Sequence, residues 1–482
     1  MRVLEQLEPK NVLSFFEDLC AIPHGSGNTK AISDYCVKFA ESRGLEVHQD
    51  GLNNVVIVKP ATPGYEAAPT VIVQGHLDMV AEKTPDSPIN FLTDGLELEV
   101  DGDFIRAKGT TLGGDDGIAV AMALAVLDAK DLAHPRLECL FTIDEETGMD
   151  GAVGFDASIL QGKRLLNIDS EEEGILTVSC AGGAHAAVRI PMTANECALD
   201  SAEIRISGLK GGHSGAEIDK GRANATITLG RVLQALVDEL EVRLVSAEGG
   251  LKDNAIPNAA RAVIALEDGK LPRAQEICAE LQDTFRREYA AADPDVTVTF
   301  TPGTVASQAL TLRDTKKVCC FLGLYPNGIE SMSMDIPGLV QTSCNLGIFK
   351  VNGSGLEGSG SVRSSIASRK QLLLRRIGLL AEGLDGTLCV SGEYPAWEYR
   401  RESHLRDVMC KVYKDQYGQD MKVEAIHAGL ECGLFCGKIP GLDAVSFGPN
   451  LYDIHTVKEH MSISSVQRVY AYLCAVLQAL KD

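Results

Sequence analysis

The sequence has little positive charge for its length. Among 482 residues, 45 lysines and arginines stand against 67 aspartates and glutamates, which gives a net charge of −22. A surface this acidic repels phosphate backbones and anionic lipid headgroups. The densest basic run, SRKQLLLRR, fits one face of a helix. We therefore predict neither a nucleic-acid partner nor a membrane partner.

Long apolar runs and regularly spaced cysteines are also missing. The longest uninterrupted apolar run, residues 118–127, is too short to cross a bilayer. The amino-terminal MRVLEQLEPKN lacks the pattern of a signal peptide. The 14 cysteines are scattered through apolar stretches, as reduced, buried thiols are. We expect a cytoplasmic protein.

Several familiar motifs are absent or incomplete. There is no GxxxxGK[ST] loop for phosphate and no GxSxG turn for a serine nucleophile. Gly353, Gly355 and Gly358 match the dinucleotide spacing, but a strand-like segment follows them where a helix is needed. Cys432 and Cys436 lie one helical turn apart, but no second thiol pair completes a zinc set. The sequence therefore excludes a phosphate-binding loop and a serine nucleophile of these types, and it disfavours a dinucleotide site and a thiol-bound zinc site.

The chain changes character twice. Up to about residue 180, apolar strands at 55–58, 71–73, 137–143 and 165–168 alternate with helical segments, which predicts an α/β sheet covered on both faces. The stretch that follows mixes helices with alternating strands, as in an α+β domain, and the α/β pattern returns near Tyr394. We predict a discontinuous α/β domain, 1–187 and 394–482, that carries an inserted α+β domain, 188–393.

Acidic residues and histidines follow the ends of the apolar strands or occupy a glycine-rich turn. In chain order they are His76 and Asp78, Asp115 and Asp116, Glu145 and Glu146, Asp169, and His455. Ligands of open α/β sheets gather at the carboxyl ends of the strands. Each acidic residue taken alone is more often a helix cap or a turn former than a ligand. Together, imidazoles and carboxylates without thiolates favour two divalent cations, Zn²⁺, Mn²⁺ or Co²⁺.

Hydrolysis at a two-metal centre needs these residue types. The metals need a bridging carboxylate, and they lower the pKa of a shared water to about 7. A separate carboxylate must take the proton and pass it to the leaving amine. The adjacent Glu145 and Glu146 offer one carboxylate for each task. Asp78 lies two residues beyond His76 and can accept the ring N–H of that histidine.

Seven motifs carry a resemblance to a known family. HLDM, GGDDG, DEETGMDGA, NIDSEEEG, GLKGGHSG, DNAIP and HAGLECGLF occur in this order over nearly the whole chain. The sequence resembles the cytosolic Xaa-His dipeptidases of the M20 family of two-metal peptidases. The resemblance implies a discontinuous two-metal peptidase catalytic domain with an inserted α+β lid domain.

The resemblance also implies roles for the acidic residues and histidines. Asp115 would bridge two metals, and Glu145 would be the general base. One metal would be bound by His76 and Asp169 and the other by Glu146 and His455, while Asp78 would orient its neighbours. Relatives often carry Ser-Pro-Asp-Glu after the last ligand where this chain has TVKE, but His455 and Glu459 keep their spacing.

The lid would contribute the substrate-binding groups. By resemblance, His213 would polarise the scissile carbonyl, in its own chain or from a partner subunit, and Asn254 and Arg363 would hold the substrate's backbone or its terminal carboxylate. His427 would line the pocket with Glu431. Structural roles remain open for His213, as a loop histidine, and for Arg363.

The implied activity is hydrolysis of unblocked, carnosine-like Xaa-His dipeptides by a metal-bound hydroxide. Two divalent ions are expected, with Zn²⁺ ahead of Mn²⁺ and Co²⁺, and a homodimer is expected. Two alternatives remain: a two-metal amidohydrolase acting on tripeptides or N-acyl amino acids, and a non-catalytic binding protein on a peptidase scaffold.

Overall fold

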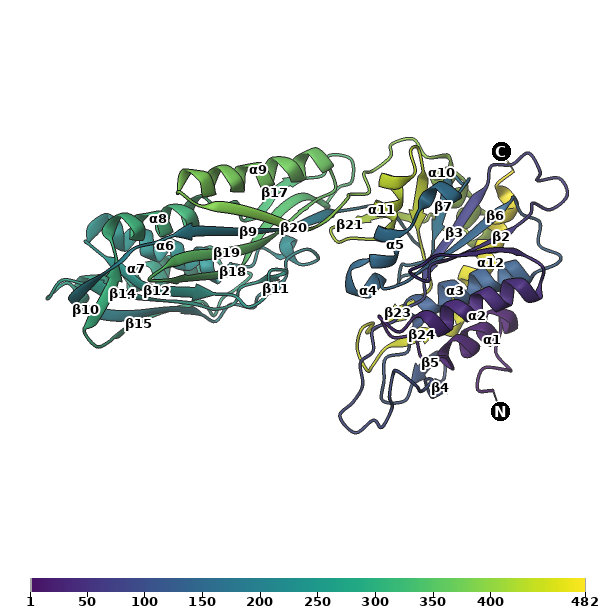
Figure 1. Ribbon diagram of the computed structural model, residues 1–482, viewed down its shortest axis with the longest axis horizontal. Helices are drawn as coiled ribbons and strands as arrows, with labels where there is room; N and C mark the ends of the chain where they lie inside the picture. Colours follow the sequence, from purple (N-terminus) through teal and green to yellow (C-terminus); the bar gives the residue numbers. More distant parts are fainter. Residues whose placement is uncertain (1, 482) are drawn as a thin grey trace. The chain divides into compact units, whose positions relative to one another are not determined.

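The computed structural model describes residues 2–481, and its chain divides into two compact units. Unit 1 comprises Met1–Ser179, Tyr399–Ala425 and Leu430–Asp482, and unit 2 comprises Cys180–Glu398 and Ile426–Gly429. Each unit has its own sheet and helices (Figure 1). The expectation that unit 1 is a catalytic domain and unit 2 a lid stays a prediction at this point.

Unit 1 is built on an eight-stranded mixed sheet. Strands β3 (Val71–His76) and β6 (Leu137–Thr142) are buried at every position, because helices cover both faces of the sheet. The strand order is β1 (Glu46–Gln49), β2 (Val55–Lys59), β6, β3, β7 (Arg164–Asn167), β22 (Asp443–Ser446), β8 (Ile175–Cys180) and β21 (Lys422–Ile426). Strands β6, β3, β7 and β22 run parallel, so their carboxyl ends share one edge.

The helices of unit 1 follow the expected alternation. Helix α3, Gly114–Asp128, is apolar all round and lies against β3, as a fully buried helix does. The others are α1 (Lys10–Cys20), α2 (Lys30–Ser42), α4 (Glu145–Gly148), α5 (Asp150–Gly154), η1 (Ala157–Ile159), α10 (His404–Tyr417), α11 (Glu431–Lys438) and α12 (Ile463–Ala479). A small second sheet has the order β23 (Leu451–Tyr452), β24 (His460–Ser462), β5 (Phe104–Ala107) and β4 (Leu98–Asp101).

Unit 2 is an antiparallel sheet with helices on it. Alternating burial along β9 (Gly182–Pro191) and β14 (Ala260–Leu266) shows one face packed and one face open. The strand order is β15 (Thr297–Pro302), β10 (Ala194–Ser207), β14, β12 (Arg243–Gly249), β18 (Val340–Asn352), β19 (Gly355–Ser364), β9 and β20 (Thr387–Tyr394). Strand β16 (Ala306–Leu310) pairs with β10, and β17 (Gly328–Met332) pairs with β18.

Four helices bury their apolar sides in the core of unit 2: α6 (Ala225–Glu239), α7 (Leu271–Glu288), α8 (Leu312–Leu324) and α9 (Ala367–Gly383). The short elements η2 (Ile218–Lys220), β11 (Gly212–His213) and β13 (Ala255–Ile256) complete it, and β11 pairs with β13. The glycine-rich segment from Gly353 forms the hairpin turn between β18 and β19, so a strand follows the first glycines where the dinucleotide motif needs a helix, as predicted.

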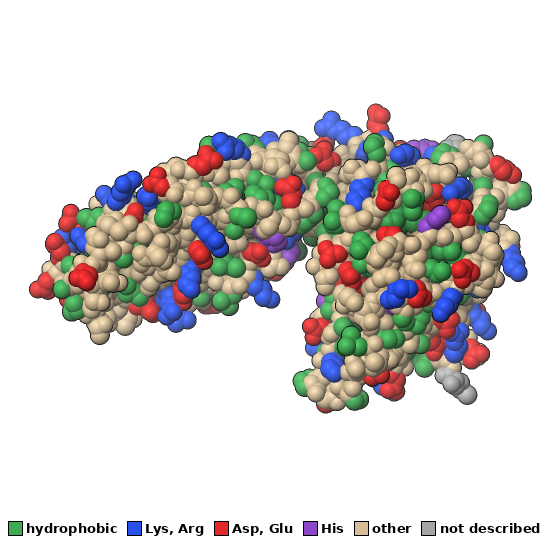
Figure 2. Space-filling model, viewed as in Figure 1, with side chains coloured by type: hydrophobic (Ala, Val, Ile, Leu, Met, Phe, Trp, Pro, Cys, Tyr) green, Lys and Arg blue, Asp and Glu red, His purple; other side chains and the backbone are tan. Residues whose placement is uncertain are grey.

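The mixed α/β fold with an inserted α+β unit is confirmed. None of the 14 cysteines, which all lie within residues 2–481, forms a disulfide, and most are buried. Among the described residues, no helix is long and apolar enough to cross a bilayer. In Figure 2, lysine and arginine side chains lie scattered among aspartates and glutamates over the visible face.

Candidate metal centre and substrate-binding cluster

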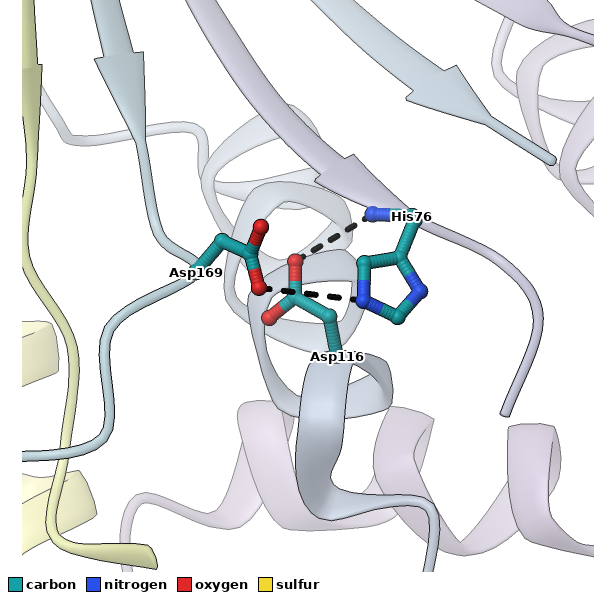
Figure 3. Close-up of side chains that lie close together, drawn as sticks. All are labelled: His76, Asp116 and Asp169. Atoms are coloured by element: carbon teal, nitrogen blue, oxygen red, sulfur yellow. Dashed lines mark hydrogen bonds and ion pairs between the residues drawn. The ribbon is translucent and has the colours of Figure 1, made fainter. Parts of the chain in front are cut away.

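The eight predicted acidic and histidine residues all lie in unit 1, most of them just beyond the carboxyl ends of β3, β6 and β7. His76 ends β3, while Asp169 follows β7 by two residues. Figure 3 shows the His76 ring and the Asp169 carboxylate facing each other, with Nε2 of His76 3.7 Å from Oδ1 of Asp169. The parallel strands therefore bring together residues that are far apart in the sequence.

Asp115 lies between the two histidines. Its Oδ1 is 3.2 Å from Nε2 of His76, and its Oδ2 is 3.1 Å from Nε2 of His455. The same nitrogen of His455 lies 3.0 Å from Oε1 of Glu146. One carboxylate oxygen thus faces each histidine, and each histidine has a further acid beside it. This is the arrangement that a carboxylate bridging two cations requires.

Glu459 holds the turn that presents Asp115. It is buried, and its carboxylate accepts hydrogen bonds from the backbone N–H groups of Leu112, Gly113 and Gly114 at 2.6–3.1 Å. Gly113 has a φ of 66°, in the left-handed region that glycine adopts without strain. The spacing of His455 and Glu459 therefore has a structural meaning: one residue faces Asp115, and the other holds its loop.

Asp78 fixes the turn of the two glutamates. Its carboxylate accepts the Glu145 N–H at 3.0 Å and the Ser26 hydroxyl at 2.8 Å. The Nδ1 of His76 lies 2.9 Å from the backbone carbonyl oxygen of Asp78 and 3.5 Å from its carboxylate. The nearest acceptor of the ring N–H is therefore the Asp78 carbonyl, which leaves Nε2 of His76 free to bind a metal.

The electrostatics of the cluster are those of acids crowded together. Burial would raise the pKa of Asp115, but hydrogen bonds from His455 and His76 hold it below its usual range. Burial and the neighbouring Asp116 raise the pKa of Asp169 well above normal. For Glu145, burial outweighs the attraction of His76, and with repulsion from Glu146 it raises the pKa to about 7.

Hydrogen bonds to Asp115 and Glu146 raise the pKa of His455 to about 10.

The ligand atoms of this cluster lie close enough together to bind cations. One group comprises His76, Asp115 and Glu146 and another His76, Asp116 and Asp169, each with its ligand atoms within 4.8 Å of one another. Imidazole nitrogens and carboxylate oxygens suit Zn²⁺ or Mn²⁺. The residues present therefore fit divalent metals.

Asp116, to which the sequence assigned no ligand role, lies beside His76 and Asp169. It is 1 % exposed, and its Oδ2 already accepts the backbone N–H of His76 at 3.2 Å (Figure 3). A Cβ atom on Gly75 would come within 2.6 Å of that oxygen, so the glycine makes room for it. His24 is also buried close by; burial lowers the pKa of its ring. The contact between Gly75 and Asp116 and the burial of His24 could not be predicted from the sequence, because they depend on segments that are far apart along the chain.

The four predicted substrate-binding residues lie in unit 2, in one cluster. A Cβ atom on Gly215 would meet the His427 carbonyl oxygen, the His213 ring and Nε of Arg363, all within 3.1 Å. Asn254 is joined to the cluster through its backbone carbonyl, which accepts the Ser214 N–H at 2.9 Å. His213 therefore gathers with Arg363 and His427 of its own chain.

The tautomer of His213 follows from its hydrogen bonds. Its Nδ1 accepts the backbone N–H groups of Ala216 at 3.0 Å and Gly215 at 3.3 Å. An Nδ1 that accepts leaves the proton of the neutral ring on Nε2. Burial, together with the positive charge of Arg363, lowers the pKa of His213, so the ring is neutral near pH 7. Nε2 is then a hydrogen-bond donor.

Arg363 is held by a tyrosine that the sequence did not suggest. Its Nη1 and the hydroxyl of Tyr394 are 3.1 Å apart, while its buried Nε has no partner among residues 2–481. The Tyr394 ring fits against Gly183 and Gly429, where added Cβ atoms would come within 2.4 Å and 2.9 Å of it. The guanidinium thus keeps a free edge, of the kind that binds carboxylates.

Comparisons with known proteins agree with this geometry. Residues 72–479 match the model of the family described as Peptidase family M20/M25/M40. The chain is 34 % identical over 482 residues to the cytosol non-specific dipeptidase of Escherichia coli, covering all of this chain and 99 % of the relative.

Solved structures are similar as well. The aminoacylhistidine dipeptidase of Vibrio alginolyticus superposes with a TM-score of 0.95 at 36 % identity, over 99 % of this chain and 98 % of the other. The aminopeptidase PepT of Bacillus cereus, with a TM-score of 0.56 at 16 % identity over 99 % and 100 % of the two chains, shares the fold.

Replacing Glu459 tests the geometry of the Asp115 turn. In Glu459→Gln, one carboxylate oxygen becomes an NH₂ group that faces backbone N–H donors, so the turn loses acceptors. We expect metal affinity to fall about 10- to 100-fold, the range seen when groups that orient ligands are lost. Competition with a chromophoric chelator measures this. Wild-type affinity in the variant would show that the turn does not depend on Glu459.

The pH dependence of stability tests the burial of His427. Burial, with repulsion from Arg363, lowers the pKa of His427 to about 4, while its Nε2 shares a hydrogen bond with Ser343. The unfolded ring, with a pKa of about 6.5, binds protons more readily. The contribution of neutral His427 to the free energy of unfolding is therefore fully present above pH 6.5. It is lost as the pH falls toward 4, by up to about 1.4 kcal/mol per pH unit.

A His427→Gln variant supplies the control for this prediction. Glutamine keeps a polar group near Ser343 but does not titrate. The difference in unfolding free energy between wild type and variant, measured by urea denaturation between pH 7 and 5, should shrink with falling pH. Parallel curves for the two proteins would contradict the prediction.

Proposed function

Because the chain belongs to peptidase family M20/M25/M40, we propose that it is a metal-dependent dipeptidase that cleaves unblocked dipeptides, Xaa-His dipeptides among them. One observation carries the proposal: both oxygens of Asp115 face a histidine, and each histidine has a second acid at hand. Similarity to dipeptidases over the full length of the chain supports the substrate class.

The roles of the ligands follow from their positions. His76 and Asp169 would bind one cation, and Glu146 and His455 the other, with Asp115 shared between them. Two divalent cations supply Lewis-acid polarisation of the substrate carbonyl and lower the pKa of water. We propose Zn²⁺ as the native metal, since its ligands are imidazole nitrogens and carboxylate oxygens.

Glu145 is proposed as the general base. Its N–H is held by Asp78, which sets the direction of the short helix α4. Because Glu145 is not among the proposed ligands, its carboxylate can take a proton from water and release it to the leaving amine. Neighbouring Glu146 differs, because it lies 3.0 Å from the His455 ring.

Unit 2 is proposed as the lid that binds the substrate. The Nε2–H of His213 would donate to the carbonyl oxygen as negative charge develops on it. The free edge of Arg363, supported by Tyr394, would hold the terminal carboxylate, and Asn254 and His427 would contact the substrate backbone and side chain. We further propose that the protein is cytoplasmic and forms a homodimer.

Replacing Glu145 separates metal binding from catalysis. Glu145→Gln removes the base but none of the proposed ligands, so elemental analysis should still find two metals per chain. Turnover should fall by about 10²- to 10⁴-fold, the contribution typical of a positioned base. Glu172→Gln, at an exposed position in the neighbouring loop, is the control and should leave both quantities unchanged. Full turnover in Glu145→Gln would remove this residue from its role.

The substrate class needs a panel of compounds. Carnosine-like dipeptides, dialanine, a tripeptide and an N-acetyl amino acid should be assayed with Zn²⁺ and with Mn²⁺. We expect the highest kcat/KM on an unblocked dipeptide. A preference for tripeptides or N-acyl amino acids would favour the alternative amidohydrolase, and two bound metals without any hydrolysis would favour a binding protein.

A further inference from the structure

Beneath the metal centre lies a second layer of polar side chains. Asn167 and Thr142 are the last residues of β7 and β6, Gln74 lies two residues before the end of β3, and all three are at most 1 % exposed. Gln74 and His76 are two residues apart on β3 and therefore point to the same face of the sheet. The layer thus lies one step down the strands from the proposed ligands.

These side chains form a continuous hydrogen-bonded chain that ends on Glu431. Asn167 Nδ2 donates to Gln74 Oε1 at 2.6 Å. Gln74 Nε2 donates to Oε2 of Glu431 at 2.6 Å, and the Thr142 hydroxyl donates to the same oxygen at 2.7 Å. Strands β7, β3 and β6 are neighbours in the sheet, so one carboxyl group from helix α11 links all three.

Glu431 is an unusual group to find at this depth. It is 0 % exposed, its partners are uncharged, and its Oε1 has no hydrogen-bond partner in the described part of the chain. Burial, with repulsion from Glu145, raises its pKa to about 8. A buried acid without a cation beside it is costly. An apolar residue of similar size would fill the volume without this cost. We therefore look for a role that needs the carboxyl oxygens of Glu431.

The backbone pairing of β3 with β6 indicates this role. The parallel pairing of β3 with β6 ends at His76 and Thr142, and one further backbone hydrogen bond, from the Leu77 N–H to the Thr142 carbonyl oxygen at 2.8 Å, joins the two chains beyond it. The ligands lie at that point or beyond it: His76 on one chain, Glu145 and Glu146 on the other. The hydrogen bonds of the Gln74 and Thr142 side chains to Glu431 therefore reinforce the backbone pairing at the last strand positions before the ligands.

We propose that Glu431 is a positioning residue, whose carboxyl oxygen ties the ends of β3 and β6 together and thereby sets the spacing of the metal-binding side chains. The inference rests on the proposed metal centre and goes beyond the pocket-wall location expected from the sequence. Glu431 belongs to neither group of closely spaced ligand atoms, and it acts through Gln74 and Thr142.

The test compares two substitutions of Glu431 by a readout that needs no substrate. Glu431→Leu removes the acceptor at similar volume and leaves two donors unpaired. Glu431→Gln keeps an oxygen for Gln74 and Thr142. We expect Glu431→Leu to weaken metal binding about 10- to 100-fold, as losses of orienting groups do, and Glu431→Gln to restore most of the affinity. Glu41→Leu, on the exposed side of α2, is the control and should bind metal as wild type does.

The Co²⁺-substituted protein gives a second, geometric readout. Its visible absorption reports ligand geometry, so the spectrum should change in Glu431→Leu and return in Glu431→Gln. Thr142→Val, which removes one donor at nearly constant shape, serves if Glu431→Leu does not fold, and an intermediate loss of affinity is expected for it. Thermal unfolding of the metal-free proteins identifies variants that do not fold.

Two outcomes would overturn the inference: wild-type metal affinity and spectrum in folded Glu431→Leu, or a Glu431→Gln variant as impaired as Glu431→Leu, which would assign the effect to charge rather than to the shared oxygen. Neither outcome bears on peptidase activity. Conversely, a wild-type protein that binds two metals but cleaves no peptide would refute the proposed function while leaving this inference standing.

Discussion

Carboxylates repel one another, and the edge of the sheet in unit 1 brings five of them together around two histidines: Asp115, Asp116, Glu145, Glu146 and Asp169 around His76 and His455. This repulsion contributes to the raised pKa values of Asp169 and Glu145. The pKa of Asp115 is lowered instead, because both histidines donate hydrogen bonds to its carboxylate. Divalent cations relieve such repulsion most effectively, because each neutralises two charges. The acids can stay together because metals compensate them.

The rest of unit 1 serves to hold these charges in place. Parallel strands bring His76 and Asp169 to one edge, Glu459 fixes the backbone of the Asp115 turn, and Asp78 fixes that of Glu145. Beneath them, the chain of side chains ending at Glu431 joins three strand ends. Each of these contacts uses a buried polar group with a defined partner, which is how a site is kept rigid before metal arrives.

Much of this could be predicted from the sequence, for physical reasons. Apolar strands that end in His76 or Asp169 place ligands at one edge because parallel strands share a direction, and the seven motifs identify the family, which the comparisons confirm. The α/β fold with its insertion is likewise confirmed. The individual catalytic and binding roles stay predictions, although the proposed ligands lie together as such roles require.

Other features could not be predicted, because they depend on side chains that meet only in three dimensions. Tyr394 reaches Arg363 because two glycines leave space for its ring. Glu431 was expected at the pocket wall with His427, yet it is buried against Gln74 and Thr142. No periodicity or spacing along the chain encodes such contacts between distant segments.

The proposed centre depends on Asp115 binding two cations at once. Crystals of the protein grown with Mn²⁺ or Zn²⁺ and measured at the metal's absorption edge would test it most directly. We expect two anomalous peaks, one beside His76 and one beside His455, each about 2.0–2.2 Å from a different oxygen of Asp115. A single peak, or two peaks that share no ligand, would contradict it.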